Sequence, residues 1–205
     1  MPLTLVDHPA AKDCLTQLRD EKTDSATFRR LSDILTTYVL IEATRGIPTE
    51  DTAVATPLEP AIGQRIRQPI VLVPILRAGI GMLRPAVDIL PDVAVGFVGL
   101  ERDEATAEAR SYYCKLPPLA GKQVILLDPM LATGGSAAYA VKFIRERGGE
   151  TITFACVVAA PEGLAKLETE QPDLPVFAAA LDRELDASKF IRPGLGDYGD
   201  RLFGT

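Results

Sequence analysis

Hydrophobic positions along the chain follow two different patterns, and the pattern changes near residue 70. Before it, residues 9–22 and 25–43 are predicted to form helices, because apolar side chains in the second recur at three- and four-residue intervals. Residues 47–69 carry four prolines among polar residues, which predicts an irregular or short-stranded excursion. The amino-terminal third is therefore expected to be mainly helical.

From residue 70 onward, short apolar runs alternate with amphipathic stretches. The apolar runs predict buried strands at 70–75, 93–100, 124–128, 151–159 and 176–181, and the stretches between them predict helices at 79–90, 135–147 and 162–170. Strands that are apolar on both faces and alternate with helices are typical of a parallel sheet covered on both sides. Residues 102–118 interrupt this alternation and predict an arm or hood over the sheet edge.

These patterns predict an α/β fold with a central, mostly parallel sheet flanked by helices, an N-terminal helical segment and the β-arm. The length suits one domain, 1–205, and the apolar content of 47% is ample for its core. The net charge of -6 argues against a nucleic-acid scaffold or an anionic membrane surface as partner. Three widely spaced cysteines, and no leader or membrane-spanning run, predict a soluble, cytoplasmic protein.

A carboxylate and a glycine-rich turn lie close together after the strand at 124–128. Asp128 ends that strand, and Thr133-Gly134-Gly135-Ser136 lies at the turn into the next helix. In open α/β sheets ligands bind beyond the carboxyl ends of the strands, and a helix N-terminus favours an anion. The turn therefore suits a phosphate and Asp128 suits hydroxyl groups, so that a phosphorylated sugar satisfies both. The alternative is an ordinary strand-to-helix turn.

Other phosphate-binding and catalytic motifs do not fit. The one Gly-Lys pair, Gly121-Lys122, is followed by Gln123 and so cannot be a P-loop. Residues 194–199 match GxGxxG, yet they follow no predicted strand and leave too few residues for the helix of a dinucleotide site. The single histidine, His8, precedes Pro9 and suits a helix start better than a catalytic relay.

An apolar strand, an acid and TGGS a few residues later resemble the phosphoribosyl-pyrophosphate signature of type I phosphoribosyltransferases. The variant DPMLATGGS is similar to that of the uracil phosphoribosyltransferase family, because Asp128 is followed by proline rather than by a second acid. The resemblance extends over essentially the whole chain. It includes PILRAG at 74–79, ERDE at 101–104, KLP at 115–117, VAAPEG at 158–163 and PGLGDYGDRLFGT at 193–205.

The resemblance implies a role for each matching position. Phosphoribosyl pyrophosphate would be bound by Arg77, Arg102, Asp128, Pro129, Met130, Leu131, Ala132, Thr133, Gly134, Gly135, Ser136 and Asp197. Uracil would be bound in the tail, 191–205, by Ile191, Gly196, Asp197 and Tyr198, largely through backbone groups that glycines allow to approach closely. Asp128, Asp197 and Arg77 would carry the catalysis. Mg²⁺ would arrive with the donor, and no residue is assigned to it directly.

The implied reaction converts uracil and phosphoribosyl pyrophosphate to UMP and diphosphate, as in pyrimidine salvage. The family forms homodimers or larger homo-oligomers, and some members respond to GTP, so a GTP effector stays open. Rival hypotheses are a purine or orotate phosphoribosyltransferase, and an RNA-binding regulator that keeps the donor site without turnover. For Arg77, the alternative to donor binding is a structural salt bridge. For Arg102, the alternative is a place in a solvent-exposed run of charged residues.

Several positions depart from the family pattern. The arm usually carries prolines in place of Ala109 and Ser111, and often a tyrosine in place of Glu101. The other three departures lie in or near the tail: Asp186 replaces asparagine, Arg192 an apolar residue, and Tyr198 an alanine.

Overall fold

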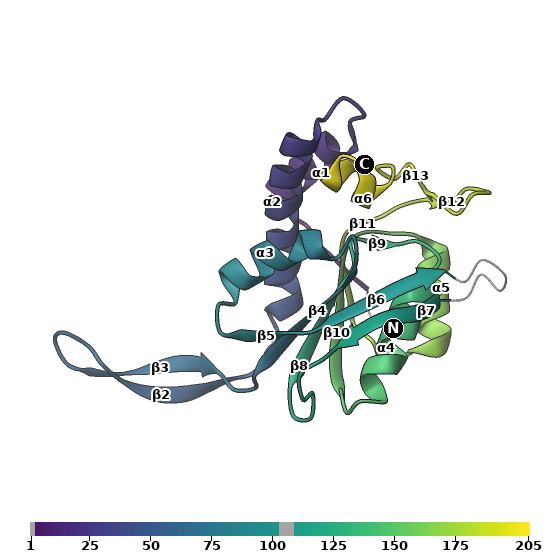
Figure 1. Ribbon diagram of the computed structural model, residues 1–205. Coiled ribbons are helices and arrows are strands. Elements are labelled where there is room, and N and C mark those ends of the chain that lie inside the picture. The colour runs from purple at the N-terminus through teal and green to yellow at the C-terminus, as the bar shows by residue number, and fades with distance from the viewer. Residues whose placement is uncertain (1–2, 103–108) are drawn as a thin grey trace.

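The computed structural model describes residues 3–102 and 109–205, and a mostly parallel sheet forms its centre (Figure 1). Its strands run in the order β1-β11-β10-β8-β4-β6-β7, with β5 beside β4 and β9 beside β10. They are β1 (Leu3–Leu5), β4 (Ile70–Leu76), β5 (Val93–Val95), β6 (Phe97–Arg102), β7 (Ala109–Lys115), β8 (Gln123–Leu127), β9 (Met130–Leu131), β10 (Thr151–Ala159) and β11 (Val176–Leu181). Within this sheet the described pairings are parallel except β6–β7, which confirms the predicted α/β class.

Helices cover both faces of this sheet. The helices are α1 (Pro9–Arg19), α2 (Ser25–Thr44), α3 (Ile80–Ile89), α4 (Gly135–Arg145), α5 (Pro161–Glu170) and α6 (Tyr198–Phe203). On β4, Ile70 and Leu72 join the core shared with α1, α2, α3 and α6, whereas Val71 and Val73 join the core shared with α4 and α5. Alternate side chains of one strand are thus buried on opposite faces, as the continuous apolar runs predict.

The segment 47–69 is more regular than the sequence suggests. Its strands β2 (Thr49–Ala55) and β3 (Pro60–Ile66) pair antiparallel along their full length and project away from the body as a two-stranded hairpin (Figure 1). Pro60 is the first residue of its strand, a position where a missing N–H costs little. The prediction of an irregular or short-stranded excursion was therefore wrong about the length and order of these strands.

Two further elements differ from their predictions. The single strand expected at 93–100 is divided into β5 and β6 at Gly96, whose N–H still donates to the Leu72 carbonyl at 2.9 Å. The tail, for which no helix was expected, ends in the short helix α6. In the described part of the arm expected at 102–118, β7 pairs antiparallel with β6 at the sheet edge, whereas residues 103–108 lie outside the described residues.

His8 caps the N-terminus of α1, because its Nδ1 accepts a hydrogen bond from the Ala10 N–H at 3.1 Å. All three cysteines are free; Cys14 and Cys156 are buried and Cys114 is exposed. None of the helices in the described part of the chain has the length and apolar character needed to span a membrane.

Candidate active site

Asp128 follows β8 directly and so lies at the carboxyl edge of the sheet. Its N–H donates to the Ala155 carbonyl of the adjacent strand at 3.2 Å, while its Oδ1 accepts a long hydrogen bond, 3.5 Å, from the Met130 N–H. Burial raises the pKa of this carboxyl from its ordinary value of 3.8 to about 7, and the bond from Met130 opposes that shift. A ligand hydroxyl or cation at this position would relieve the cost of the buried charge.

Residues 133–136 form a tight turn that opens α4. Gly134 is the N-cap residue, with a left-handed φ of 77°, and no side chain caps the helix. The first N–H groups of α4 are therefore free to bind an anion. A cavity of about 150 Å³ lies against this turn, and its walls come from Asp128, Met130, Leu131, Ala132, Thr133, Gly134, Gly135, Ser136, Ala137 and Lys189. The predicted acid and the predicted phosphate turn thus share one cavity.

Pro129 is the one member of the predicted segment 128–136 that does not line this cavity. It is buried, and its carbonyl accepts hydrogen bonds from Val157 and Val158 at 2.9 and 3.0 Å. Leu131 lines the cavity but is only 1% exposed, so its side chain belongs mainly to the core. Both residues shape the turn and are poorly placed for polar contacts with a ligand.

Arg77 follows β4, the strand beside β8. Register pairs Pro74 with Leu127, so the segments that leave these two strands start at the same edge of the sheet. Gly79 lets them approach, because a Cβ there would lie 2.4 Å from the Leu127 carbonyl oxygen. Arg77 is exposed, and within the described residues no acid lies in ion-pair contact with it, so a structural salt bridge is not found. The side chain of Arg102 lies outside the described part of the structure.

A partly buried ion pair fixes the backbone of the tail. Arg19 donates from both terminal nitrogens to the Asp182 carboxylate at 2.6 and 2.8 Å, and also to the Gly194 carbonyl at 2.7 Å. Asp182 in turn accepts from the Gly194 N–H at 2.8 Å. Two glycines nearby, Gly194 and Gly196, have positive φ values of 62° and 81°. The loop before α6 is therefore a fixed backbone surface, as close recognition of a small planar ligand requires.

The four residues expected to bind the base differ in what they expose. Ile191 is buried at 4% exposure, so only its backbone is available. Gly196 and Asp197 are exposed, and Asp197 caps α6 by accepting from the Asp200 N–H at 2.9 Å. Tyr198 points into the core, where its ring meets Phe28 edge-on and its hydroxyl is hydrogen bonded to Ser32. A side-chain role for Tyr198 in ligand binding is therefore not supported, and its backbone remains the candidate.

Sequence reasoning missed three supporting features of this region. Arg19 and Asp182 form an ion pair that holds the tail. Asp182 follows β11 at the same carboxyl edge as Asp128, and this position was the one signal in the sequence that could have marked it as a residue of the site. Glu162, in the VAAPEG segment, accepts from the Leu185 N–H at 2.9 Å and so links α5 to the tail. Lys189 lines the Asp128 cavity although no sequence motif contains it.

A substitution pair tests whether the turn at 134 needs glycine. In Gly134→Ala the Cβ would lie 2.7 Å from the Gly163 carbonyl oxygen, at a φ that disfavours alanine, so we expect a loss of about 1–3 kcal/mol in stability. In Gly135→Ala the nearest atom would be 3.7 Å away, and stability should be unchanged or slightly raised. Urea unfolding of both variants checks this, and equal stabilities would contradict the proposed packing of the turn.

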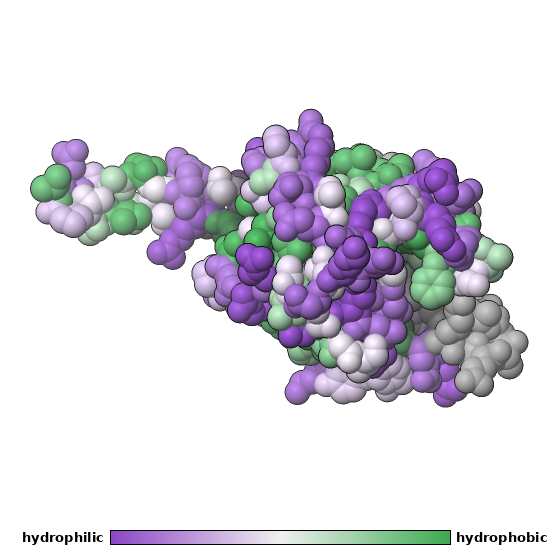
Figure 2. All heavy atoms as spheres, turned by 90° about the horizontal axis from the view of Figure 1, so that it is seen from above, coloured by the Kyte–Doolittle hydropathy of each residue, from purple (hydrophilic) through white to green (hydrophobic). Residues whose placement is uncertain are grey.

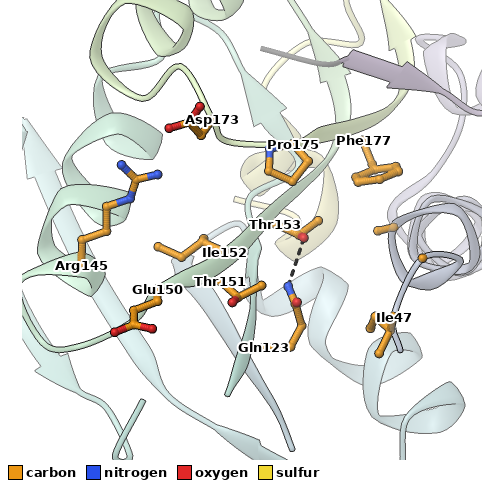
Figure 3. Close-up of a pocket in the computed structure, with 12 residues that line it drawn as sticks. Ile47, Gln123, Arg145, Glu150, Thr151, Ile152, Thr153, Asp173, Pro175 and Phe177 are labelled. Atoms are coloured by element: carbon orange, nitrogen blue, oxygen red, sulfur yellow. Dashed lines mark hydrogen bonds between the residues drawn. The ribbon is translucent and has the colours of Figure 1, made fainter. Parts of the chain in front are cut away.

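A larger cavity, of about 440 Å³, lies at the opposite end of the strands (Figure 3). Gln123 and Thr153 meet there through a 3.1 Å hydrogen bond, and Arg145, Glu150 and Asp173 stand around its rim. It contains none of the candidate residues. Because ligands of open α/β sheets bind at the carboxyl edge, the smaller cavity is the better candidate for the active site.

The α/β fold described above is the fold of type I phosphoribosyltransferases. Solved structures with low sequence identity share the fold, among them a hypoxanthine-guanine phosphoribosyltransferase from Bacillus anthracis, with a TM-score of 0.52 and 13% identity over 77% of this chain and 80% of that one. A protein from Aquifex aeolicus is much nearer, with a TM-score of 0.94 and 35% identity over 99% of this chain and 98% of that one.

Sequence comparison defines the family within this class. The family model described as uracil phosphoribosyltransferase matches residues 5–205. A relative of that name from Salinibacter ruber is 49% identical over 99% of this chain and 97% of its own. Another from Nocardioides is 50% identical over 98% and 97%. The chain belongs to the uracil phosphoribosyltransferase family, and it is a glycosyltransferase enzyme.

Proposed function

We propose that the protein transfers the phosphoribosyl group of phosphoribosyl pyrophosphate to uracil, giving UMP and diphosphate. One observation carries this proposal: a carboxyl with few partners, Asp128, shares a cavity with the free N–H groups at the start of α4. The relatives from Salinibacter ruber and Nocardioides carry the name of this activity and match nearly the whole chain.

In the proposed complex the donor spans the carboxyl edge of the sheet. The 5-phosphate accepts hydrogen bonds from the turn 133–136, and the ribose hydroxyls donate to Asp128. Arg77 and Arg102 contact the diphosphate and neutralise charge as it leaves. The exposed position of Arg77 after β4, without a described ion-pair partner, supports its part in this role.

Magnesium fits this site as an ion carried by the donor. Among the described residues no group of three or more His, Cys, Asp or Glu side chains could hold a metal. Asp128 would offer one carboxylate to the complex of donor and metal, in keeping with the preference of Mg²⁺ for phosphate oxygens, water and a few carboxylates. The bound ion would offset the negative charge of the diphosphate.

The base is proposed to bind against the tail loop. Uracil presents alternating donors and acceptors at its edge, which backbone groups of 194–198 can satisfy because two glycines there adopt positive φ. N1 of uracil forms the new bond to C1 of the ribose as the bond from C1 to the diphosphate oxygen breaks, and the N1 proton is lost. Asp197 is exposed on this loop, and it is proposed to contact both substrates.

We also propose that the protein is cytoplasmic and forms a homodimer or a larger homo-oligomer. The β2–β3 hairpin supports the assembly, because it projects from the body and carries exposed apolar side chains (Figure 2). Leu58, in its turn, is 96% exposed, and Ile62 on β3 is 71% exposed. Apolar side chains on a protruding hairpin mark an interaction surface.

The reaction is tested by product identification. Purified protein with uracil, phosphoribosyl pyrophosphate and Mg²⁺ should yield UMP and diphosphate in equal amounts, as measured by mass spectrometry and a coupled diphosphate assay. Leaving out the uracil should stop diphosphate release. Diphosphate release that continues without a base would indicate hydrolysis of the donor and count against the proposed transfer.

A further inference from the structure

Lys189 brings a positive charge to a cavity that otherwise has one acid and no other basic side chain on its described walls. The cavity is the one formed by Asp128 and residues 130–137, and Lys189 reaches it from a distant part of the sequence. Since a phosphate bound at the start of α4 is strongly negative, a cation in the same cavity would add to the backbone N–H groups.

The backbone at Lys189 is unusual. Among the described residues it is the one non-glycine residue with a positive φ, 69°. A lysine in this region is strained compared with glycine, and such outliers cluster at functional sites. The positive φ of Lys189 and its position on the cavity wall are two separate observations about the same residue.

A local network holds the loop that presents Lys189. This loop, residues 186–190, joins β12 (Glu184–Leu185) to β13 (Ile191–Arg192). Asp186 accepts from the N–H groups of Ser188 and Phe190 at 2.9 and 3.0 Å and forms an ion pair with Arg192 at 2.8 Å. Two of the departures from the family pattern, Asp186 and Arg192, are thus partners. These contacts hold the loop in place.

The same hairpin is attached to the phosphate turn through α5. Glu162, in the first turn of α5, accepts from the Leu185 N–H at 2.9 Å. The next residue, Gly163, packs against Gly134: a Cβ on Gly134 would lie 2.7 Å from the Gly163 carbonyl oxygen. Glu162 and Gly163 therefore connect the loop of Lys189 to the turn that it faces.

The charges around Lys189 leave its ammonium group available. Glu162 is near enough for Lys189 to contribute to the lowering of its pKa, although hydrogen bonding from the Leu185 N–H is the main cause. Within the described residues, neither Glu162 nor Asp128 forms an ion pair with Lys189 inside 4 Å. A phosphate at the turn would therefore not have to displace an existing partner.

We propose that Lys189 is a specificity-determining residue that binds the phosphate monoester of the sugar ligand, together with the N–H groups of the turn 133–136. This inference rests on the proposed function, because it assigns a further contact to the same donor. It predicts that Lys189 selects for the phosphorylated form of the sugar and acts on binding of the donor rather than on the chemical step.

The test uses three substitutions with different effects on charge and backbone. Lys189→Gly removes the charge and suits the positive φ, Lys189→Ala removes the charge and keeps the strain, and Lys189→Arg keeps the charge. We expect the KM for the donor to rise about fivefold in the glycine and alanine variants with kcat unchanged, and to stay within about twofold in the arginine variant. Lys166→Ala, which removes a lysine paired with Glu170 on α5, is the matched control.

Calorimetric titration with ribose 5-phosphate, and with ribose as the unphosphorylated control, separates this inference from the proposed function. Weaker binding of ribose 5-phosphate to Lys189→Gly than to the wild type supports the role of Lys189, even if no base is turned over. Equal binding to the two proteins overturns it and leaves the transfer reaction standing. Absence of ribose 5-phosphate binding to the wild type also overturns it.

Discussion

Replacing Asp128 with asparagine should reduce kcat/KM for the donor by about 10- to 100-fold, because a charged hydrogen-bond acceptor for the ribose is lost. The same change should leave the protein folded and raise its stability near pH 8. The carboxyl has its pKa raised to about 7 by burial, so an ionised Asp128 is a cost to the folded state, and asparagine removes that cost.

The pH dependence of this gain follows from the two pKa values. The folded protein holds the Asp128 proton up to about pH 7, whereas the unfolded chain releases it near the ordinary value of 3.8. The destabilising effect of Asp128 is therefore absent below about pH 4, grows as the pH rises, and is complete above about pH 7. Asp128→Asn should be more stable than the wild type by roughly 1–3 kcal/mol at pH 8, and by less at pH 5.

Urea unfolding at pH 5 and pH 8, together with steady-state kinetics, measures both effects. Asp173→Asn is the control, because Asp173 is an exposed acid at the cavity on the opposite end of the sheet. Full activity in a folded Asp128→Asn protein would remove Asp128 from the active site. A large loss of stability at pH 8 would show that the carboxylate supports the fold.

Arg77→Ala should raise the KM for the donor, or lower kcat, by at least about tenfold, because a charge-assisted phosphate contact contributes roughly 1.5–3 kcal/mol. Stability should change little, since Arg77 is exposed and forms no ion pair with a described residue. Arg84→Ala is the matched control: Arg84 is also an exposed arginine, and it pairs with Asp33 at 3.0 Å. A destabilised Arg77→Ala protein with normal kinetics would instead identify a structural role.

The elements that the sequence predicts well are those with strong local patterns. The strands at 70–75 and 151–159 are continuous apolar runs, and the helix at 25–43 has a clear apolar stripe; all three are present. The positions of Asp128 and of the turn 133–136 follow from the predicted strand at 124–128 and the predicted helix at 135–147, since this strand and this helix fix the turn between them. The fold class, and the position of the candidate acid and turn at the carboxyl edge of the sheet, were therefore accessible from pattern alone.

The parts that were missed depend on contacts between distant segments. The β2–β3 hairpin has prolines near its ends and polar residues along it, so nothing local separates it from an irregular loop. Tyr198 could not be assigned to the core before its neighbours Phe28 and Ser32 were known. Lys189 belongs to no recognised motif. It lies 53 residues after Ser136 in the sequence, and only the β12–β13 hairpin brings it to the cavity that Ser136 lines.

The choice of base is the most direct test of the central claim. With Mg²⁺ and phosphoribosyl pyrophosphate, diphosphate release should be measured separately for uracil, cytosine, orotate, guanine and adenine. Efficient release is expected with uracil and little with the others, because the slot proposed along the backbone of the tail loop would exclude purines by size and would leave polar groups unpaired with cytosine, a mismatch that can cost several powers of ten. A comparable rate with a purine would contradict the assignment to uracil, and no release with any base would favour a ligand-sensing regulator.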